Sequence, residues 1–280
     1  MVTREKSAVE AQLQSLFEQT GGVTAAFSSK AGDYVVSRPD YPAALYAGLY
    51  EIGALFANAE VADIGAGTGL LTEALLQRGH AVAAVEPNAA MRAAAQARLH
   101  GYRKYRSVAA GAENTTLPDG SIDLVAVAQA FHWFEVASFR RECLRILKPQ
   151  GQVALIWNTR PLSDPLQAAI AAAFAEFGGD KQIALANRQD MANVPPFFAG
   201  AHFHRLDLAH TQRLDRDGLL SLLFSRSFMP ERDTPAGRRA DRSIRDLFDG
   251  FADAGEVTLH YRTLAMVGRP HPELHSEAQQ

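Results

Sequence analysis

The sequence has little of three things: cysteine, long apolar runs and net charge. Cys143 is the single cysteine among 280 residues, so the chain can form no internal disulfide, which favours a reducing, cytoplasmic setting. No run of 18 uncharged apolar residues occurs, so we expect no membrane-spanning helix, and no secretory signal pattern is recognisable. A net charge of −3 gives no electrostatic reason to expect nucleic acid or an anionic membrane as a partner.

What the sequence does have is a regular alternation of short apolar segments and helical patterns. Strands are expected at 61–64, 81–85, 105–108, 122–127 and 152–157, with helices at 70–78, 89–99 and 135–147 between them. A turn is expected at Lys148-Pro149-Gln150-Gly151, and a further helix from Pro42 to about Phe56. Alternation of this kind predicts an α/β fold, in which a mostly parallel sheet carries helices on both faces.

A glycine-rich loop follows the first of these strands: Gly65-Ala66-Gly67-Thr68-Gly69. Gly65 and Gly67 are expected to let backbone N–H groups approach a ligand, and Gly69 to let the next helix pack close to the strand. The third glycine comes one residue earlier than in the G-x-G-x-x-G fingerprint of dinucleotide-binding proteins. The loop therefore favours a nucleotide-like ligand other than NAD.

Polar residues follow the other expected strands. In parallel sheets, ligands bind beyond the carboxyl ends of the strands. Glu86 stands at such an end, where a carboxylate can accept hydrogen bonds from a ribose diol. Met91, on the next helix, is expected either to pack against an adenine or to face the core. Glu113 and Gln129 follow the third and fourth strands, so the sequence predicts one site along this edge of the sheet.

Asp63-Ile64-Gly65-Ala66-Gly67-Thr68-Gly69 resembles the first motif of class I S-adenosylmethionine (SAM) dependent methyltransferases. The segments 34–42 and 128–134 are similar to a branch that includes trans-aconitate methyltransferase-like enzymes. The resemblance implies a Rossmann-like fold with a seven-stranded, mostly parallel sheet and a helical cap. It also implies SAM as the cofactor and S-adenosylhomocysteine as its product.

The resemblance also assigns roles within the cofactor site. Tyr34 and Arg38 would flank the methionine end of SAM, and the backbone of Gln129 would meet its amino group. Asp63 would orient the loop or reach the amino group through water, and Ala112-Glu113 would read the adenine edge. The cofactor-binding residues expected are Tyr34, Arg38, Asp63, Gly65, Ala66, Gly67, Glu86, Pro87, Met91, Ala112, Glu113 and Gln129.

Two aromatic segments are candidates for the acceptor side. Residues 27–42 are expected to form a lid over a small-molecule site, or a loop whose aromatic side chains enter the core. In the segment 129–134, His132 is the candidate catalytic residue, as a general base or a group that hydrogen-bonds the substrate, with a structural histidine as the alternative. The residues expected to bind substrate are Phe27, Tyr41, Trp133, Arg160, Ser225 and Arg226.

The expected domain organisation is a helical extension, one catalytic domain and a tail. Residues 1–26 would be the extension, 27–269 the methyltransferase domain, and 270–280 a disordered tail. Within the domain, 27–60 would be a lid, 61–160 the SAM-binding core and 161–235 partly a substrate cap. Beyond 160 we expect helices at 163–176, 215–227 and 236–253, strands at 202–208 and 256–267, and a loop containing Pro195-Pro196.

The function expected from these features is transfer of a methyl group to O or N of a small organic molecule, with a carboxylate or heterocyclic metabolite as the candidate acceptor. A monomer or homodimer is expected. The alternatives are a SAM-binding scaffold without catalysis and an NAD-dependent oxidoreductase, although no hydride-transfer residues accompany the glycine loop. His202 and His204 alternate on one expected strand without a third ligand nearby, so no metal site is expected.

Overall fold

The structure is a computed structural model that describes residues 39–180, 182 and 191–272. The expected helical extension, the residues Phe27, Tyr34 and Arg38, and all of the tail beyond 272 lie outside this part of the chain. The described residues fall into two compact units. Unit 2 holds residues 40–159, 191–210 and 262–272, and unit 1 holds residues 39, 160–180, 182 and 211–261.

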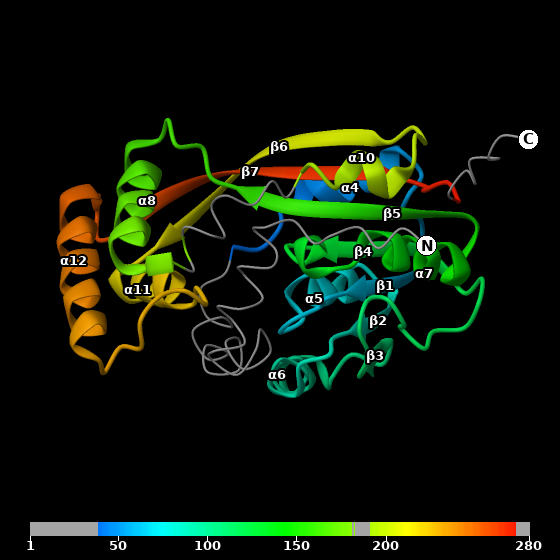
Figure 1. Cartoon of the computed structure of the whole chain (residues 1–280), viewed down its shortest axis with the longest axis horizontal. Helices are drawn as coiled ribbons and strands as arrows, with labels where there is room; N and C mark the ends of the chain where they lie inside the picture. Colours follow the sequence, from blue (N-terminus) through cyan, green and yellow to red (C-terminus); the bar gives the residue numbers. More distant parts are fainter. Residues whose placement is uncertain (1–38, 181, 183–190, 273–280) are drawn as a thin grey trace, which may run out of the picture. The chain divides into compact units, whose positions relative to one another are not determined.

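A seven-stranded sheet organises the fold (Figure 1). Its strands follow the order β3-β2-β1-β4-β5-β7-β6; β1 to β5 run parallel and β7 is antiparallel to β5. The strands are β1 (Glu60–Ile64), β2 (Ala81–Val85), β3 (Tyr105–Val108), β4 (Ile122–Ala128), β5 (Leu147–Thr159), β6 (His204–Leu214) and β7 (Val257–Gly268). The expected seven-stranded, mostly parallel sheet is confirmed.

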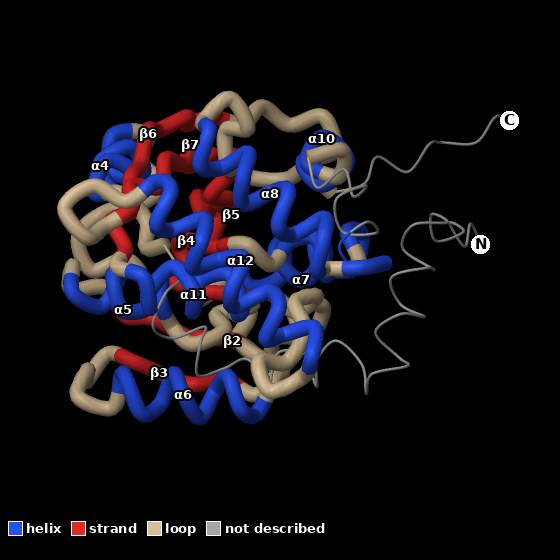
Figure 2. The backbone as a smooth tube through the Cα atoms, turned by 90° about the vertical axis from the view of Figure 1, so that its left-hand side faces the viewer, coloured by secondary structure: helices blue, strands red, loops and turns tan. Residues whose placement is uncertain are grey.

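Helices cover both faces of the sheet in unit 2. Its helices are α4 (Ala43–Glu51), α5 (Leu70–Gln77), α6 (Ala89–Leu99), the 3-10 turn η1 (Phe131–Trp133), α7 (Val136–Ile146) and α10 (Val194–Phe198). Successive residues of β1 belong to the apolar cores on opposite faces of the sheet. Val61 lies in the core with α4, α5 and α6, and Ala62 lies in the core with α7 and α10. Figure 2 shows α6 running beside β3. The expected two-faced arrangement is therefore present.

Unit 1 has its own apolar core, formed by three helices and the adjoining strand ends. The helices are α8 (Pro165–Phe177), α11 (Arg216–Phe224) and α12 (Pro235–Phe251). Phe174, Leu220 and Ile244, one from each helix, are buried in this core. Each of these helices lies close to its expected position. The proposed roles of 27–60 as a lid, 61–160 as the cofactor core and 161–235 as a substrate cap stay predictions.

The structure corrects three local expectations. Pro195 and Pro196 belong to α10, where they occupy the first turn of a helix and no intrahelical N–H is needed. Residues 148–151 continue β5, because a bulge against β4 absorbs the irregularity and Gly151 lies against the carbonyl oxygen of Ile122. The helix after Pro42 ends at Glu51, ahead of Gly53 with its positive φ of 71°.

None of the helices within the described ranges is both long and apolar enough to cross a membrane.

Candidate functional site

The edge formed by the carboxyl ends of the parallel strands collects the candidate cofactor residues. The strand order reverses between β1 and β4, which is where ligands bind in open parallel sheets. Ile64 pairs with Val85 at the ends of β1 and β2. Gly65 and Glu86 therefore leave neighbouring strands at the same level, and Gln129 follows the end of β4.

The glycine loop has the conformation that only glycine adopts easily. Gly65, Gly67 and Gly69 have φ values of 73°, 57° and 82°. A Cβ atom at position 65 would lie 2.5 Å from the Cβ of Ala130, in the segment after β4. At position 69 it would lie 2.6 Å from Leu99 of α6, so Gly69 permits close packing against α6 rather than against the strand.

Two N–H groups of this loop bond within the protein. The N–H of Gly65 donates to the carbonyl oxygen of Val85 at 2.9 Å. The N–H of Gly67 donates to Oε2 of Glu86 at 3.0 Å. These two groups hold the loop to the end of β2, and the approach of a ligand to the loop backbone stays a prediction. The glycines are needed for backbone conformation and for close approach.

Glu86 connects the loop to the start of α6. Its Oε2 accepts from Gly67, its Oε1 accepts from the N–H of Asn88 at 2.8 Å, and Asn88 in turn caps α6. Burial raises the pKa of Glu86 above its ordinary value, and the two N–H donors oppose that rise. Because each carboxylate oxygen carries two lone pairs, one accepting position per oxygen is left for a ribose diol.

Asp63 is buried and bonded to a residue that the sequence did not single out. Its Oδ2 accepts from the hydroxyl of Thr72 at 2.6 Å, which ties β1 to α5. Burial raises the pKa of Asp63 to about 7, and the neighbouring charge of Glu86 acts in the same direction. The signal that would have found Thr72 is its polar side chain among the apolar positions of α5.

The loop between β3 and β4 holds the residues expected to read the adenine. Ala112 is buried in the core, and Glu113 is exposed, with its Oε1 accepting from the N–H of Glu135 at 2.9 Å. Met91 is buried and Pro87 is exposed. The structure thus gives Glu113 a partner at the start of α7 that the sequence did not indicate.

Gln129 has a left-handed backbone conformation at the end of β4. Its φ is 60°, which costs energy in a residue other than glycine. Its N–H donates to Ile156, and its Nε2 donates to the carbonyl oxygen of Asn158 at 3.2 Å. The side chain of Asn158 donates to the carbonyl oxygen of Asp40 at 3.0 Å and accepts from Thr263 at 2.7 Å. Strain held by its neighbours is typical of functional positions.

The aromatic segment after β4 divides into packing residues and residues near the loop. Phe131 is buried and makes edge-on contact with the rings of Trp157 and Phe197, so its role is structural. Phe134 borders the glycine loop: a Cβ at position 65 would lie 3.3 Å from its ring. His132 and Trp133 are half-buried, with ring centroids 5.0 Å apart. A catalytic role for His132 stays a prediction.

The expected substrate residues are divided between the units. Tyr41 is half-buried against the unit 2 core, on the face covered by α4, α5 and α6. In unit 1, the guanidinium carbons of Arg160 and Arg226 lie 4.8 and 5.9 Å from the ring centroid of Phe174. Ser225 is fully buried, and its hydroxyl donates to the carbonyl oxygen of Leu222. Their substrate roles stay predictions.

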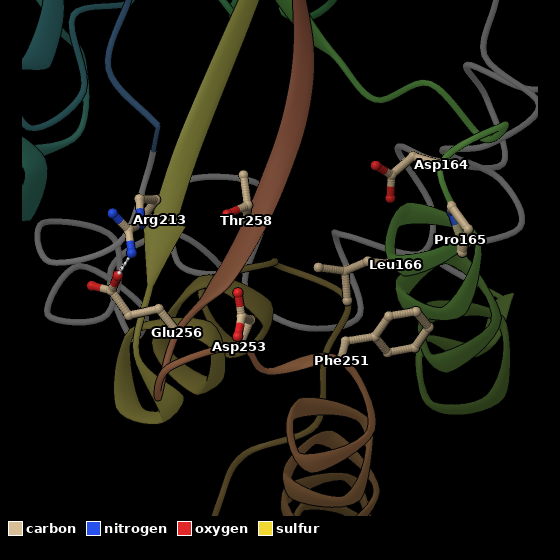
Figure 3. A pocket seen from close by; sticks show the side chains of 8 residues that line it. All are labelled: Asp164, Pro165, Leu166, Arg213, Phe251, Asp253, Glu256 and Thr258. Atoms are coloured by element: carbon tan, nitrogen blue, oxygen red, sulfur yellow. Dashed lines mark ion pairs between the residues drawn. The ribbon is translucent and has the colours of Figure 1, made fainter.

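Unit 1 also has a surface cavity of about 350 Å³ (Figure 3). Asp164, Arg213 and Glu256 are among the residues that line it, and Arg213 forms an ion pair with Glu256. No residue expected to bind substrate lines this cavity. The rings of His202 and His204 lie 5.2 Å apart, and the described part of the chain holds no cluster of three or more potential metal ligands.

The comparison with protein families gives a match to the family described as "Methyltransferase domain" over residues 62–155. An uncharacterized methyltransferase of Mycobacterium tuberculosis is 40% identical over 134 residues, which are 48% of this chain and 52% of the relative. A ubiquinone biosynthesis O-methyltransferase of Pseudomonas aeruginosa is 36% identical over 124 residues, which are 42% of this chain and 52% of the relative. The chain thus spans about half the length of these curated relatives.

Among solved structures, a candidate type II methyltransferase from Anaeromyxobacter dehalogenans matches with a TM-score of 0.59 and 23% identity. The match covers 84% of this chain and 99% of that one. The antiparallel β7 beside β5 also distinguishes this sheet from the all-parallel sheet of dinucleotide-binding proteins. Residues 62–155 are thus similar to the methyltransferase domain family, and the chain has the same Rossmann-like fold as this solved methyltransferase structure.

Proposed function

We propose that this protein is a SAM-dependent methyltransferase that methylates O or N of a small organic molecule. The observation that carries the proposal is the position of Glu86. Its carboxylate closes the glycine loop through Gly67 and keeps accepting positions at the switch point of the sheet. A ribose diol fits this acceptor, and the glycine conformation at Gly65 fits close approach to a ligand.

SAM supplies a methyl group activated by a positively charged sulfur. Because this charge is neutralised during transfer, the protein contributes mainly alignment of the acceptor and exclusion of water. Gly65, Glu86 and Gln129 would hold the cofactor, with Ala112-Glu113 at its adenine edge. A general base is needed when the acceptor is a hydroxyl or a protonated amine, and His132 is the candidate for that role.

A small acceptor is supported by the description of one matched relative and by the net charge of the chain. The Pseudomonas aeruginosa relative is described as an O-methyltransferase of ubiquinone biosynthesis. The net charge of −3 gives no general attraction for nucleic acid. If the acceptor is a carboxylate, Arg160 and Arg226 are the cations that we propose for its recognition.

The proposal is tested by isothermal titration of the purified chain with S-adenosylhomocysteine. We expect saturable binding, and Glu86→Ala should weaken it by about 100-fold, because the ribose loses a charged acceptor and the loop loses its partner. Glu86→Gln keeps the shape and one acceptor oxygen, so it should weaken binding by about tenfold. Absence of heat at millimolar ligand, or equal affinity of the Glu86→Ala variant, would reject the proposal.

Catalysis is then tested separately from binding. Release of S-adenosylhomocysteine is followed in a panel of small acids, phenols and heterocyclic amines. Turnover with any of them, abolished or strongly reduced in a Glu86→Ala variant, supports an enzyme. Tight binding without turnover across the panel would favour the alternative of a SAM-binding scaffold.

A further inference from the structure

The loop between β3 and β4 is tied to α7 at alternate residues. Glu113 accepts from the backbone of Glu135, Thr115 donates to Glu142, and the carbonyl oxygen of Leu117 accepts from Arg145. The contacts run from Glu135, the N-cap residue of α7, to Arg145 in its last turn. The whole stretch that follows Ala112 is therefore held against a single helix.

Glu142 is the centre of these contacts. Its side chain is only 7% exposed. One oxygen, Oε1, accepts both from the N–H of Thr115 at 2.7 Å and from its hydroxyl at 2.5 Å. Burial acts to raise the pKa of Glu142, but the hydrogen bonds from Arg145 and Thr115 outweigh it and leave the pKa below its ordinary value. Glu142 is therefore ionised at neutral pH, and its bonds to the loop are charge-assisted.

Arg145 completes the arrangement from the next turn of α7. Its Nη2 and Nε donate to the two oxygens of Glu142 at 2.7 and 2.9 Å. Its Nη1 donates to the carbonyl oxygen of Leu117 at 2.8 Å and pairs with Asp119. A planar guanidinium has several donors in fixed directions. It can therefore orient the carboxylate of Glu142 and bind the loop backbone at the same time.

Thr115, which Glu142 binds, stands two residues after Glu113 in the segment expected to meet the adenine. Ala112 is anchored in the core, and Glu113 is held at the start of α7. A loop that is already ordered loses less conformational entropy when a ligand binds, and its hydrogen-bonding groups are already aligned. The contacts to Glu142 and Arg145 supply this order from outside the site.

We propose that Glu142, oriented by Arg145, is a positioning residue that presets the Ala112-Glu113 segment to recognise the adenine base of the cofactor. The inference rests on the proposed function, which gives this segment its ligand. Glu142 itself touches only protein groups in the contacts described, so its effect is on cofactor affinity and base selectivity.

The test compares two ligands that differ only in the base. S-adenosylhomocysteine carries the exocyclic amine of adenine, and S-inosylhomocysteine carries a carbonyl oxygen in its place. Isothermal titration with both ligands is run on the unmodified chain, on Glu142→Gln and on Thr115→Val, with thermal melting alongside. The unmodified chain should prefer the adenine ligand by about tenfold or more, the effect expected of one hydrogen bond to a charged group.

Asp123→Asn is the matched control. Like Glu142, Asp123 is a largely buried carboxylate, 11% exposed, that accepts from a backbone N–H, of Glu60, and from a cation, Lys148. It stands at the start of β4, at the amino ends of the parallel strands, whereas Ala112-Glu113 follows the carboxyl end of β3. The control should lower the melting temperature without changing the ratio of the two affinities.

In Glu142→Gln we expect about tenfold weaker binding of S-adenosylhomocysteine and a selectivity ratio reduced to about threefold or less. Thr115→Val should give a smaller change in the same direction. If Glu142→Gln does not fold, Thr115→Val alone tests the positioning role of Glu142. A lower melting temperature with an unchanged selectivity ratio in the folded variants, or an unmodified chain that does not discriminate the bases, overturns the inference. Failure of the proposed function is distinct: the unmodified chain would then bind neither ligand.

Discussion

The two units of this protein hold their predicted functional residues in different ways. In unit 2, Glu86, Glu113 and Gln129 each bond to the backbone of another segment, so their positions follow from the sheet and its loops. In unit 1, Ser225 bonds within its own helix and Arg226 lies near an aromatic ring. The family match, over residues 62–155, falls entirely in unit 2.

This difference shows which chemistry can be identified from sequence. A cofactor site built at strand ends depends on backbone geometry, and backbone geometry is encoded by glycine positions and strand spacing. An acceptor site in unit 1 would depend on side chains whose neighbours are set by packing. We therefore expect changes at the strand ends of unit 2 to alter cofactor binding, and changes at Arg160 and Arg226 in unit 1 to alter acceptor use.

The largest effect is expected for Gly65→Ala in unit 2. The substitution combines a φ of 73° with a Cβ placed 2.5 Å from that of Ala130, so the loop and the segment after β4 must move apart. Stability should fall by about 3 kcal/mol and affinity for S-adenosylhomocysteine by about 100-fold. Chemical denaturation and isothermal titration measure the two effects.

Gly120→Ala is the control that measures the cost of a positive φ alone, without any steric contact. Gly120 has a φ of 56°, and a Cβ there would meet no atom within 4 Å. It should cost about 1 kcal/mol and leave the affinity unchanged. If Gly65→Ala behaved like Gly120→Ala, close approach at the loop would not matter for binding.

The next effect is a pH dependence from Asp63. Its pKa is about 7 in the folded chain and 3.8 for the unperturbed group, so the folded state holds the proton more tightly. The stabilisation is complete below about pH 4 and is lost as the pH rises through 7, by a total on the order of a few kcal/mol. Asp63→Asn should remove this decline while keeping an acceptor for Thr72.

Denaturation of both forms between pH 4.5 and 8 measures the effect. The unmodified chain should lose more stability across this interval than Asp63→Asn does. Parallel curves for the two forms would mean that Asp63 is ionised in the folded chain across the whole interval.

Smaller effects on binding are expected from the arginines of unit 1. Arg160→Ala and Arg226→Ala each remove a cation near the ring of Phe174, which should cost about 1 kcal/mol or less in stability. Affinity for S-adenosylhomocysteine should stay within twofold, while KM for an acidic acceptor should rise about tenfold. A loss of cofactor affinity in either variant would contradict the assignment of cofactor binding to unit 2 alone.

The smallest effect is expected for Ser225→Ala. The hydroxyl is buried and donates to Leu222 in the same helix, so its loss should cost about 1 kcal/mol and leave KM for the acceptor unchanged. Thermal melting and steady-state kinetics check both values. An increase in KM of about fivefold or more would instead support the substrate role expected from the sequence.

Much of unit 2 was predictable because its signals are local. The spacing of apolar residues predicted β1 to β4 within about one residue, and the glycine loop predicted the start of α5. Asn88 caps α6 as its residue type indicates. The failures have two causes. Pro195 lies in the first turn of α10, where proline is tolerated, and the continuation of β5 through Pro149 depends on pairing with β4, which overrides the turn preference.

The sequence by itself determined the succession of strands and helices, the need for glycine in the loop after β1 and the row of polar residues at the strand ends. These properties follow from periodicity, from the absence of a Cβ and from the rule that parallel strands end at one edge. Only the tertiary structure decided what those polar groups bond to. Thr72 on Asp63, Gly67 on Glu86 and Glu142 on Thr115 join residues distant in sequence, and a hydrogen bond between such residues forms only where packing brings donor and acceptor within about 3 Å.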